Sequence, residues 1–512
     1  MEILTSKPSD IIFNISQLYR NIYDKIIEQY NNEKFIDINR IEELFNILRN
    51  DRIKLHGLLV SKEIENLNEK AIIKEVRRIY YEKGIILKTA HKIPISIQKD
   101  GVKIRYSRYL LTPKNKESAD KLKKLENKRG VFPLDMALGV SDLPHNMTVN
   151  AMLKVGKVAQ ASRSYKNASE TLAADHGIQL DPATIMTVTN QIGEIAFKNE
   201  LAQAEESYNR FSSRKTSFSP NRKDGVLYIE INGAFVNARE QSADSNSSFH
   251  ESKLGLVFSS DCRRVVQKSG SASLRQTPAN GLERKRYELT EKNYAAYVGS
   301  VDVFKKLMLN CALKGGYGTY KETVVISDGA TWIRNLKEEL FYDAQKILDY
   351  FLLCEKIWSF GKQYFKIKAT KSMHNKSQVD EISKADNPKY EKYKEWGDDI
   401  CLKLLQSKID VVLNDILEKE NKMRLQNNKL STYIIDNKQS TDYAKYLKQG
   451  YDIGSGAIES ENKTIIQRRL DGHGMRWRIK SAQNVITLRA KFESGKWHND
   501  VVVPAYKYYD IL

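Results

Sequence analysis

Hydrophobic and polar positions change their spacing along this chain, and the changes divide it into segments. Apolar side chains recur at helical intervals within residues 11–22 and 41–48, so the first ninety residues are predicted to be helical. Residues 91–112 alternate around the Asp100-Gly101 pair, which predicts a hairpin. A Lys-rich helix or linker is expected after it, up to residue 130.

Residues 164–197 have the layout of a helix-turn-helix. The first helix would be lined by Ala168, Leu172 and Ala173. Gly177 allows the turn, and the second helix would begin at Asp181 or Pro182. The side chains expected to be exposed on the second helix, and to face a DNA groove, are Thr184, Thr187, Thr189, Asn190 and Gln191. Because a helical hairpin is also a common packing unit, the pattern leaves both roles open.

From residue 225 the apolar residues follow strand-like patterns. The elements expected in chain order are strands at 225–238, 249–266 and 283–291, a helix at 293–313, a strand at 322–330, a helix at 331–340 and a strand at 345–351. This order predicts an α/β fold with a mixed sheet. The predicted segments are 1–90 (helical), 91–130 (hairpin and basic linker), 131–204 (helix-turn-helix), 225–354 (first part of the core), 355–450 (helical insertion) and 451–512 (closing helices and basic C-terminal region).

The charge of the chain indicates a polyanionic partner. Its 83 Lys and Arg outnumber 64 Asp and Glu, for a net charge of +19, and nucleic acid is the leading candidate. A Lys-rich solvated surface would give the same composition. The four cysteines stand singly, which indicates neither a zinc site nor a disulfide framework. Without a signal-peptide pattern or an apolar run of about 18 residues, the sequence favours a cytoplasmic, nucleoid-associated bacterial protein.

Three polar positions stand where metal ligands are often displayed. Asn232 and Asp328 each follow an apolar strand and precede a glycine. Glu459 is in the run Gly-Ser-Gly-Ala-Ile-Glu-Ser, where Ser455 is a candidate N-cap and the glycines permit close backbone approach. Taken singly, the three are equally typical of a strand cap, a turn and a helix N-terminus. Together they can converge on two Mg²⁺ ions about 3.5–4 Å apart, an arrangement used in phosphoryl transfer.

Several longer blocks resemble the ISKra-type insertion-sequence transposases of the DDE/DDD class. These blocks are VVISDGATWIRNLKEELFYDAQKILDYF, YDIGSGAIESENKTIIQRRLDGHGMRW and VITLRAKFESGKW, preceded by FPLDMALGV, INGAFVNARE and SKLGLVF. The resemblance extends from about residue 130 to about residue 500. It implies an α/β ribonuclease H-like catalytic core with a long helical insertion, preceded by mainly helical DNA-binding regions that include the helix-turn-helix.

The resemblance aligns Asp328 with the family's second catalytic carboxylate and Glu459 with its third, at a two-metal site for Mg²⁺ or Mn²⁺. The first should be an aspartate, and this chain has Asn232 there. An asparagine carbonyl ligates Mg²⁺ without adding negative charge, so metal affinity is expected to fall unless Glu230, on the same strand face, completes the site. Two more family features are absent: a histidine after Asp349, and cysteines before the FPLD block. These departures favour natural divergence over an engineered substitution.

The resemblance also implies double-stranded DNA as the partner, both as terminal inverted repeats and as target. A homodimer or higher homo-oligomer is expected, because two DNA ends must be brought together. Further residues expected to contact DNA are Lys253, Arg468, Arg469, Arg476, Arg478 and Lys480. For Lys253 a solvated strand lysine is the alternative, and Trp477 is favoured as a packed side chain.

Three functions are compatible with these patterns. The first is an active transposase that cuts transposon ends and joins them to a target. The second is a catalytically inactive descendant that binds specific DNA, with Asn232 as the cause of its inactivity. The third is a ribonuclease H-like nuclease without strand transfer. Restoring aspartate at residue 232 separates the first two, and joined products separate the first from the third.

Overall fold

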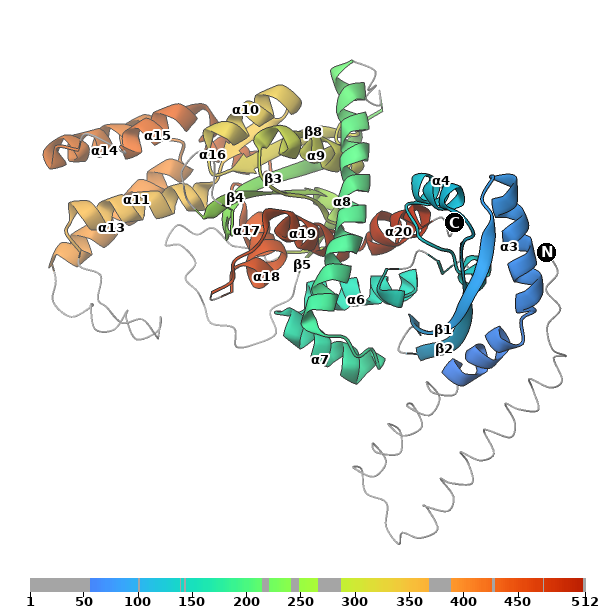
Figure 1. Ribbon diagram of the computed structural model, residues 1–512. Helices are drawn as coiled ribbons and strands as arrows, with labels where there is room; N and C mark the ends of the chain where they lie inside the picture. The colour runs from blue at the N-terminus through green and yellow to red at the C-terminus, as the bar shows by residue number, and fades with distance from the viewer. Residues whose placement is uncertain are drawn as a thin grey trace, which may run out of the picture. The chain divides into compact units, whose positions relative to one another are not determined.

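The computed structural model describes residues 56–99, 102–138, 140–141, 144–213, 221–240, 248–265, 287–367, 388–425, 429–472 and 474–509 (Figure 1). The helical patterns at 11–22 and 41–48, and the Asp100-Gly101 turn, lie outside these residues. The chain forms two compact units, Met1–Ala196 with His498–Leu512 and Phe197–Trp497. Within the described ranges there is no helix with the length and apolar character needed to cross a membrane.

The first unit contains the predicted hairpin, packed against helices. β1 (Leu87–Lys99) pairs antiparallel with β2 (Val102–Pro113), and this confirms the alternation between 91 and 112. Helices α3 (Glu69–Glu82) and α5 (Pro133–Ala137) share a buried core with the hairpin. The Lys-rich segment that follows is a helix, α4 (Lys116–Glu126).

The helical hairpin between 164 and 197 is present in the same unit, after α6 (Val149–Ala161). Its first helix, α7 (Tyr165–His176), ends at Gly177, whose φ of 65° is the left-handed conformation that glycine adopts without strain. The second, α8 (Pro182–Ser212), begins at the predicted residue. The Asp181 carboxylate accepts hydrogen bonds from the N–H groups of Ala183 and Thr184, both at 2.9 Å, and so caps α8.

Two details of this hairpin differ from the prediction. Ala168 and Leu172 are fully buried, but Ala173 is exposed, because it follows Leu172 directly and therefore points to another side of α7. α8 is 31 residues long and continues to Ser212, so the expected boundary at residue 204 falls inside a helix. The unit closes with a π-helical turn, His498–Val502, and α20 (Val503–Tyr508).

The second unit is built on a mixed five-stranded sheet, which confirms the predicted α/β class (Figure 1). Its strands, in spatial order, are β7 (Asn293–Val298), β4 (Phe249–Ser259), β3 (Lys223–Asn237), β8 (Tyr320–Ser327) and β9 (Gln345–Leu348). β3 pairs antiparallel with β4, and β4 with β7; β3 pairs parallel with β8, and β8 with β9. β3 therefore has strands on both sides, and its central residues are buried.

The two faces of β3 are covered by different helices. Leu227, Ile229 and Ile231 belong to a core with residues of α9 (Val301–Lys314) and α10 (Thr331–Leu340). Since side chains alternate along a strand, Glu230 projects to the other face, where it meets α17 (Gly456–Asn462). α19 (Ile479–Glu493) packs against β7 through Gln483, which accepts a hydrogen bond from the Val298 N–H at 2.9 Å.

The third strand of the sheet is not the one predicted from the sequence. Residues 287–289 form β6 (Tyr287–Leu289), which pairs with β5 (Arg263–Val265) in a separate small sheet. Strand β7 occupies residues that the sequence placed at the start of a helix, and the helix begins only at Val301. Alanine favours helices, but the pairing of β7 with β4 and the break at Gly299 and Ser300 outweigh that preference.

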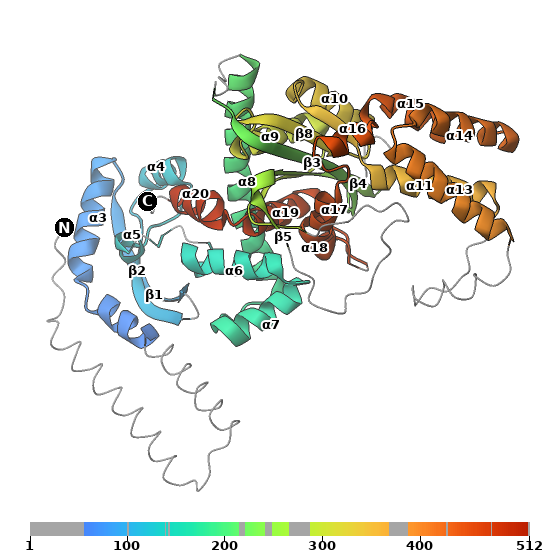
Figure 2. The same cartoon turned by 180° about the vertical axis from the view of Figure 1, so that it is seen from behind.

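The predicted insertion is mainly helical in its described residues. It consists of α11 (Tyr350–Tyr364), α13 (Pro388–Leu405), α14 (Ile409–Met423), α15 (Leu430–Asn437) and α16 (Tyr443–Lys448). The strand expected at 345–351 ends at Leu348, because the carboxylate of Asp349 accepts hydrogen bonds from the N–H groups of Phe351 and Leu352 and starts α11. Figure 2 shows α11 and α17 at the same end of the sheet.

Candidate active site

The three polar positions singled out in the sequence border one pocket in the second unit. This cavity, of about 490 Å³, is lined by Asn232, Asp328, Leu352, Glu355, Lys356, Ser359, Glu459, Asn462, Lys463 and Gln467. These residues come from segments that together span more than two hundred positions of the chain, from Asn232 to Gln467, so the fold is what brings them together. Their catalytic role stays a prediction.

Asn232 and Asp328 are neighbours because of the strand register. β3 and β8 run parallel with Ile231 opposite Ser327, so the residues that follow are Asn232, still in β3, and Asp328, directly after β8. The Asn232 side chain makes no hydrogen bond with another described residue. In Asp328, one carboxylate oxygen accepts a hydrogen bond from the Ala330 N–H at 3.0 Å, while its backbone carbonyl accepts one from the Tyr433 hydroxyl. Both side chains are partly exposed to the pocket.

Glu459 is in the first turn of α17, and the loop before this helix is held by Asp349. One carboxylate oxygen of Asp349 accepts hydrogen bonds from the N–H and the hydroxyl of Ser455, both at 2.5 Å. Ser455 stands directly before α17 as predicted, but its hydroxyl bonds Asp349 instead of capping the helix. Asp349 and Ser455 are almost fully buried, at 1% and 2% exposure. The start of α11 and the start of α17 are therefore fastened to one carboxylate.

The glycines around Ser455 have different environments. A Cβ on Gly454 would lie 2.3 Å from a ring carbon of Phe351, so this position requires the absence of a side chain. A Cβ on Gly456 would have no atom within 4 Å. The predicted close backbone approach is confirmed at Gly454 and is wrong at Gly456.

Glu230 holds the other side of α17. Its carboxylate accepts a hydrogen bond from the Ile458 N–H at 2.7 Å and is 1% exposed. Burial raises the pKa of Glu230 to about 8; the hydrogen bond from Ile458 opposes this shift, and the nearby carboxylates of Asp452 and Asp349 add to it. Glu230 is not among the residues that border the pocket, so in this structure its carboxylate serves the helix that carries Glu459.

The pocket offers oxygen atoms of the kind that hard divalent cations bind. They belong to the carboxylates of Asp328 and Glu459 and to the amide of Asn232. Asn462 is 6% exposed, and its Oδ1 has no hydrogen-bond partner among the described residues. Across the described ranges no group of three or more His, Cys, Asp or Glu side chains is placed to hold a metal ion.

Part of the pocket wall was not anticipated from the sequence. One face of α11 borders the cavity, through side chains that recur at helical spacing: Leu352, Glu355, Lys356 and Ser359. Their spacing was visible in the sequence, but the placement of α11 beside the strand ends was not. Lys463 and Gln467 come from the π-helical turn that follows α17, Lys463–Gln467.

Two of the basic residues expected to contact DNA are buried. Lys253 is 3% exposed, and its ammonium donates to Glu251 and to the Gly299 carbonyl, both at 2.8 Å, so it is not available to DNA in this structure. Arg469 is 2% exposed, with its guanidinium 4.9 Å from the centre of the Trp477 ring. Trp477 is packed, as favoured. The basic candidates that are exposed are Arg468, Arg476, Arg478 and Lys480.

The α8 side chains that were expected to face DNA also differ in their exposure. Thr187 is exposed, although its hydroxyl donates to the Ala183 carbonyl at 2.9 Å. Thr184 is half-buried and bonds the Asp181 cap, and Gln191 donates to the Tyr509 hydroxyl at 2.8 Å. Asn190 is half-buried. Thr189 is fully buried and donates to the Ile185 carbonyl, so its expected exposure is wrong.

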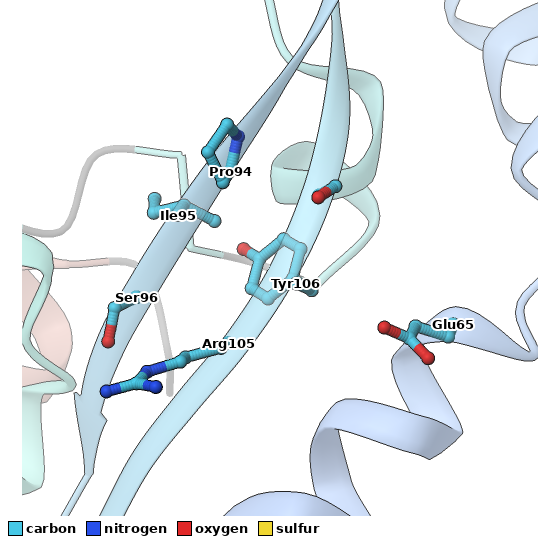
Figure 3. A pocket seen from close by; sticks show the side chains of 7 residues that line it. Glu65, Pro94, Ile95, Ser96, Arg105 and Tyr106 are labelled. Atoms are coloured by element: carbon cyan, nitrogen blue, oxygen red, sulfur yellow. The ribbon is translucent and has the colours of Figure 1, made fainter.

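A second cavity lies in the first unit. It measures about 420 Å³ and is bordered by Pro94, Ile95 and Ser96 of β1, by Arg105, Tyr106 and Ser107 of β2, and by Glu65 (Figure 3). None of the candidate site residues is in it. The Tyr106 hydroxyl donates to Asp135 at 2.9 Å, so this side chain is engaged in the packing of the unit.

No protein-family model and no curated protein matches the chain. Among solved structures, the chain is similar to the Drosophila P element transposase strand transfer complex, at 10% sequence identity and a TM-score of 0.30. The similarity covers 74% of this chain and 97% of that chain. A TM-score this low does not establish a shared fold.

Proposed function

We propose that the protein is a DNA transposase of the DDE class, which cleaves and transfers DNA strands with divalent metal ions. The observation that carries the proposal is the shared pocket of Asn232, Asp328 and Glu459. The proposed ribonuclease H-like core is supported by the sheet, in which β3 pairs with antiparallel strands on one side and parallel strands on the other.

Mg²⁺ or Mn²⁺ would be held by the carboxylates of Asp328 and Glu459, with the amide oxygen of Asn232 as a neutral ligand. The ions would supply charge stabilisation at the reacting phosphate. The oxygen donors that border the pocket support this fit, because hard divalent cations prefer carboxylate and amide oxygens. Glu230 and Asp349 would act as positioning residues, since each bonds the segment that carries Glu459.

The proposed partner is double-stranded DNA, with terminal inverted repeats and target bound by a dimer or larger assembly. The exposed residues Arg476, Arg478 and Lys480 support a contact with DNA phosphates. The second candidate function, an inactive descendant that binds specific DNA, is favoured by Asn232 alone, because its amide removes one negative charge from the pocket.

The test is strand cleavage and joining on labelled duplexes taken from both flanks of the protein's own gene, with Mg²⁺ or Mn²⁺. The parent chain is compared with Asn232→Asp, Asp328→Asn and Glu459→Gln; the last two keep side-chain size and remove charge. The proposal predicts metal-dependent joined products from Asn232→Asp and none from either carboxylate variant. Cleavage that persists in both carboxylate variants would sink the assignment. Cleavage without joining would indicate a nuclease, and specific binding without chemistry in every variant would indicate the DNA-binding descendant.

A further inference from the structure

Two aromatic side chains are exposed where β3 ends and β4 begins. Phe235 is 68% exposed and Phe249 is 54% exposed, although both strands are central in the sheet. In the β3–β4 register Phe249 lies opposite Asn237, two residues after Phe235, so both rings project from the same face. Nearer the middle of the sheet α9 and α10 cover this face, whereas at its end the two rings face solvent.

An extended segment from a distant part of the chain lies beside the end of β3 and adds positive charge to this face. Trp477 forms a parallel bridge with Ala238, and both side chains are buried. Ala238 follows Phe235 by three residues, so it projects to the opposite face, and Trp477 projects with it. Arg476 and Arg478 flank Trp477 and therefore project to the face of Phe235. Both are exposed, and neither side chain makes a hydrogen bond or ion pair with another described residue.

The backbone that carries these arginines is fixed by hydrogen bonds. The Trp477 N–H donates to the Asn237 carbonyl at 3.0 Å, and the Trp477 carbonyl accepts from the Arg239 N–H at 2.7 Å. The Glu240 carboxylate accepts from the N–H of Ile479, the first residue of α19, at 3.3 Å. A surface that is already ordered loses little conformational freedom when it binds a partner.

The chemistry of this face suits an anion with flat, apolar rings. Glu251 lies opposite Phe235, and its carboxylate accepts a hydrogen bond from the Lys253 ammonium at 2.8 Å, so its negative charge is balanced. Arg476 and Arg478 then give the face an excess of positive charge. Unpaired nucleotides match this combination, because bases stack on exposed aromatic rings and phosphates bind guanidinium groups. In a closed duplex the bases stack on one another instead.

We infer that this face binds unpaired nucleotides of DNA, with a base stacked on Phe235. The face, called the aromatic face below, consists of Phe235, Phe249, Arg476 and Arg478. The inference rests on the proposed function and names the form of DNA that the chain binds, a duplex with an opened or single-stranded end. Phe235 follows Asn232 by three residues, about 10 Å along β3, and projects to the other side of the sheet. The stacked nucleotide is therefore outside the pocket.

The experiment measures the affinity of the full chain for two fluorescein-labelled DNA probes by fluorescence anisotropy, without divalent metal. One probe is a blunt duplex, and the other is the same duplex with a single-stranded 3′ overhang of thymines. Phe235→Ala is compared with Phe235→Trp, which keeps a ring. The control, Tyr342→Ala, removes a ring of similar exposure, 65%, just before β9, at the edge of the sheet where the parallel strands begin.

The parent should bind the overhang probe more tightly than the blunt probe. Phe235→Ala should weaken binding to the overhang probe by about fivefold or more, as the loss of one stacked base does, and should leave the blunt probe unaffected. Phe235→Trp should keep the preference for the overhang, and Tyr342→Ala should bind both probes as the parent does. Because the Phe235 ring is exposed, Phe235→Ala should unfold in urea at the same concentration as the parent.

The outcomes separate this inference from the proposed function. Equal affinity of the parent and Phe235→Ala for the overhang probe would overturn the inference and leave the proposed function standing if the blunt duplex is bound. An equal loss on both probes would also overturn it, because such a ring would not need unpaired bases. If the parent binds neither probe, the inference and the proposed DNA partner are both wrong. Loss of self-association by Phe235→Ala in sedimentation velocity, with unchanged DNA affinity, would assign the aromatic face to a second copy of the chain.

Discussion

Replacing Asp349 with alanine should loosen the segment that carries Glu459 and destabilise the second unit. The Asp349 carboxylate accepts four hydrogen bonds: from the N–H groups of Phe351 and Leu352 at 2.7 and 2.9 Å, and from the N–H and hydroxyl of Ser455 at 2.5 Å each. Water does not compete for the two Ser455 donors, because Asp349 and Ser455 are buried. The substitution removes an acceptor that no neighbouring group replaces.

The magnitude follows from the two kinds of bond that are lost. Losing the cap of α11 costs about 1 kcal/mol. Leaving the buried Ser455 donors without an acceptor costs about 1–3 kcal/mol for each donor. Together these give a loss of about 3–7 kcal/mol in the free energy of unfolding. Ser455→Ala is the milder control variant, because it removes only one of the four hydrogen bonds and leaves no donor unpaired. It should lower the free energy of unfolding by about 1 kcal/mol.

Tryptophan fluorescence during urea unfolding is the appropriate assay, because all five tryptophans lie in the second unit. They are Trp332, Trp358, Trp396, Trp477 and Trp497. The expected order of stability is parent, then Ser455→Ala, then Asp349→Ala, with unchanged dependence on urea. A loss below about 1 kcal/mol for Asp349→Ala would refute the reasoning, since one lost cap alone accounts for that much.

Three further changes have defined outcomes. Burial raises the pKa of Glu230 from 4.5 to about 8. Between these two pH values the folded protein keeps a proton on Glu230 that the unfolded chain has released. The free energy of unfolding should therefore fall by up to about 1.4 kcal/mol for each unit that the pH rises through this range. Glu230→Gln should lack this slope in urea titrations at three pH values within the window; equal slopes would contradict the assigned burial. Gly454→Ala should lower the free energy of unfolding, measured by urea titration, by about 1–3 kcal/mol, because it forces a Cβ against Phe351. Gly456→Ala should leave it nearly unchanged. Lys253→Met should lower the melting temperature and leave DNA affinity, measured by fluorescence anisotropy, unchanged; weaker DNA binding by a fully folded variant would restore Lys253 as a contact.

The parts of the fold that the sequence predicted well are those with local causes. The alternation of Leu227, Ile229 and Ile231 with polar residues places one face of β3 in the core, and the structure confirms it. α10 occupies the predicted residues 331–340, and α8 begins at the predicted proline. In each case the signal, either the spacing of apolar residues or the residue that begins the helix, is contained in the segment itself.

The errors arise where distant segments decide the outcome. β7 has a composition that favours a helix, yet pairing with β4 makes it a strand. Lys253 and Arg469 are basic residues in a basic chain, and only their partners in the fold show that they are buried. Glu355 gave no sign of its place in the pocket, because its proximity to Asp328 depends on where α11 starts, and Asp349 sets that start.

The same contacts bear on whether one substitution at residue 232 is enough to change activity. The segment that carries Glu459 is held by Glu230, by Asp349 and by the close approach of Gly454 to Phe351. Asn232 takes no part in these contacts, since its side chain makes no hydrogen bond with another described residue. The loss of an aspartate there would therefore leave the geometry of the other two carboxylates unchanged. If the proposed function is correct, Asn232→Asp should raise metal-dependent cleavage without changing stability, because it adds a charge to a pocket that the rest of the chain already holds in place.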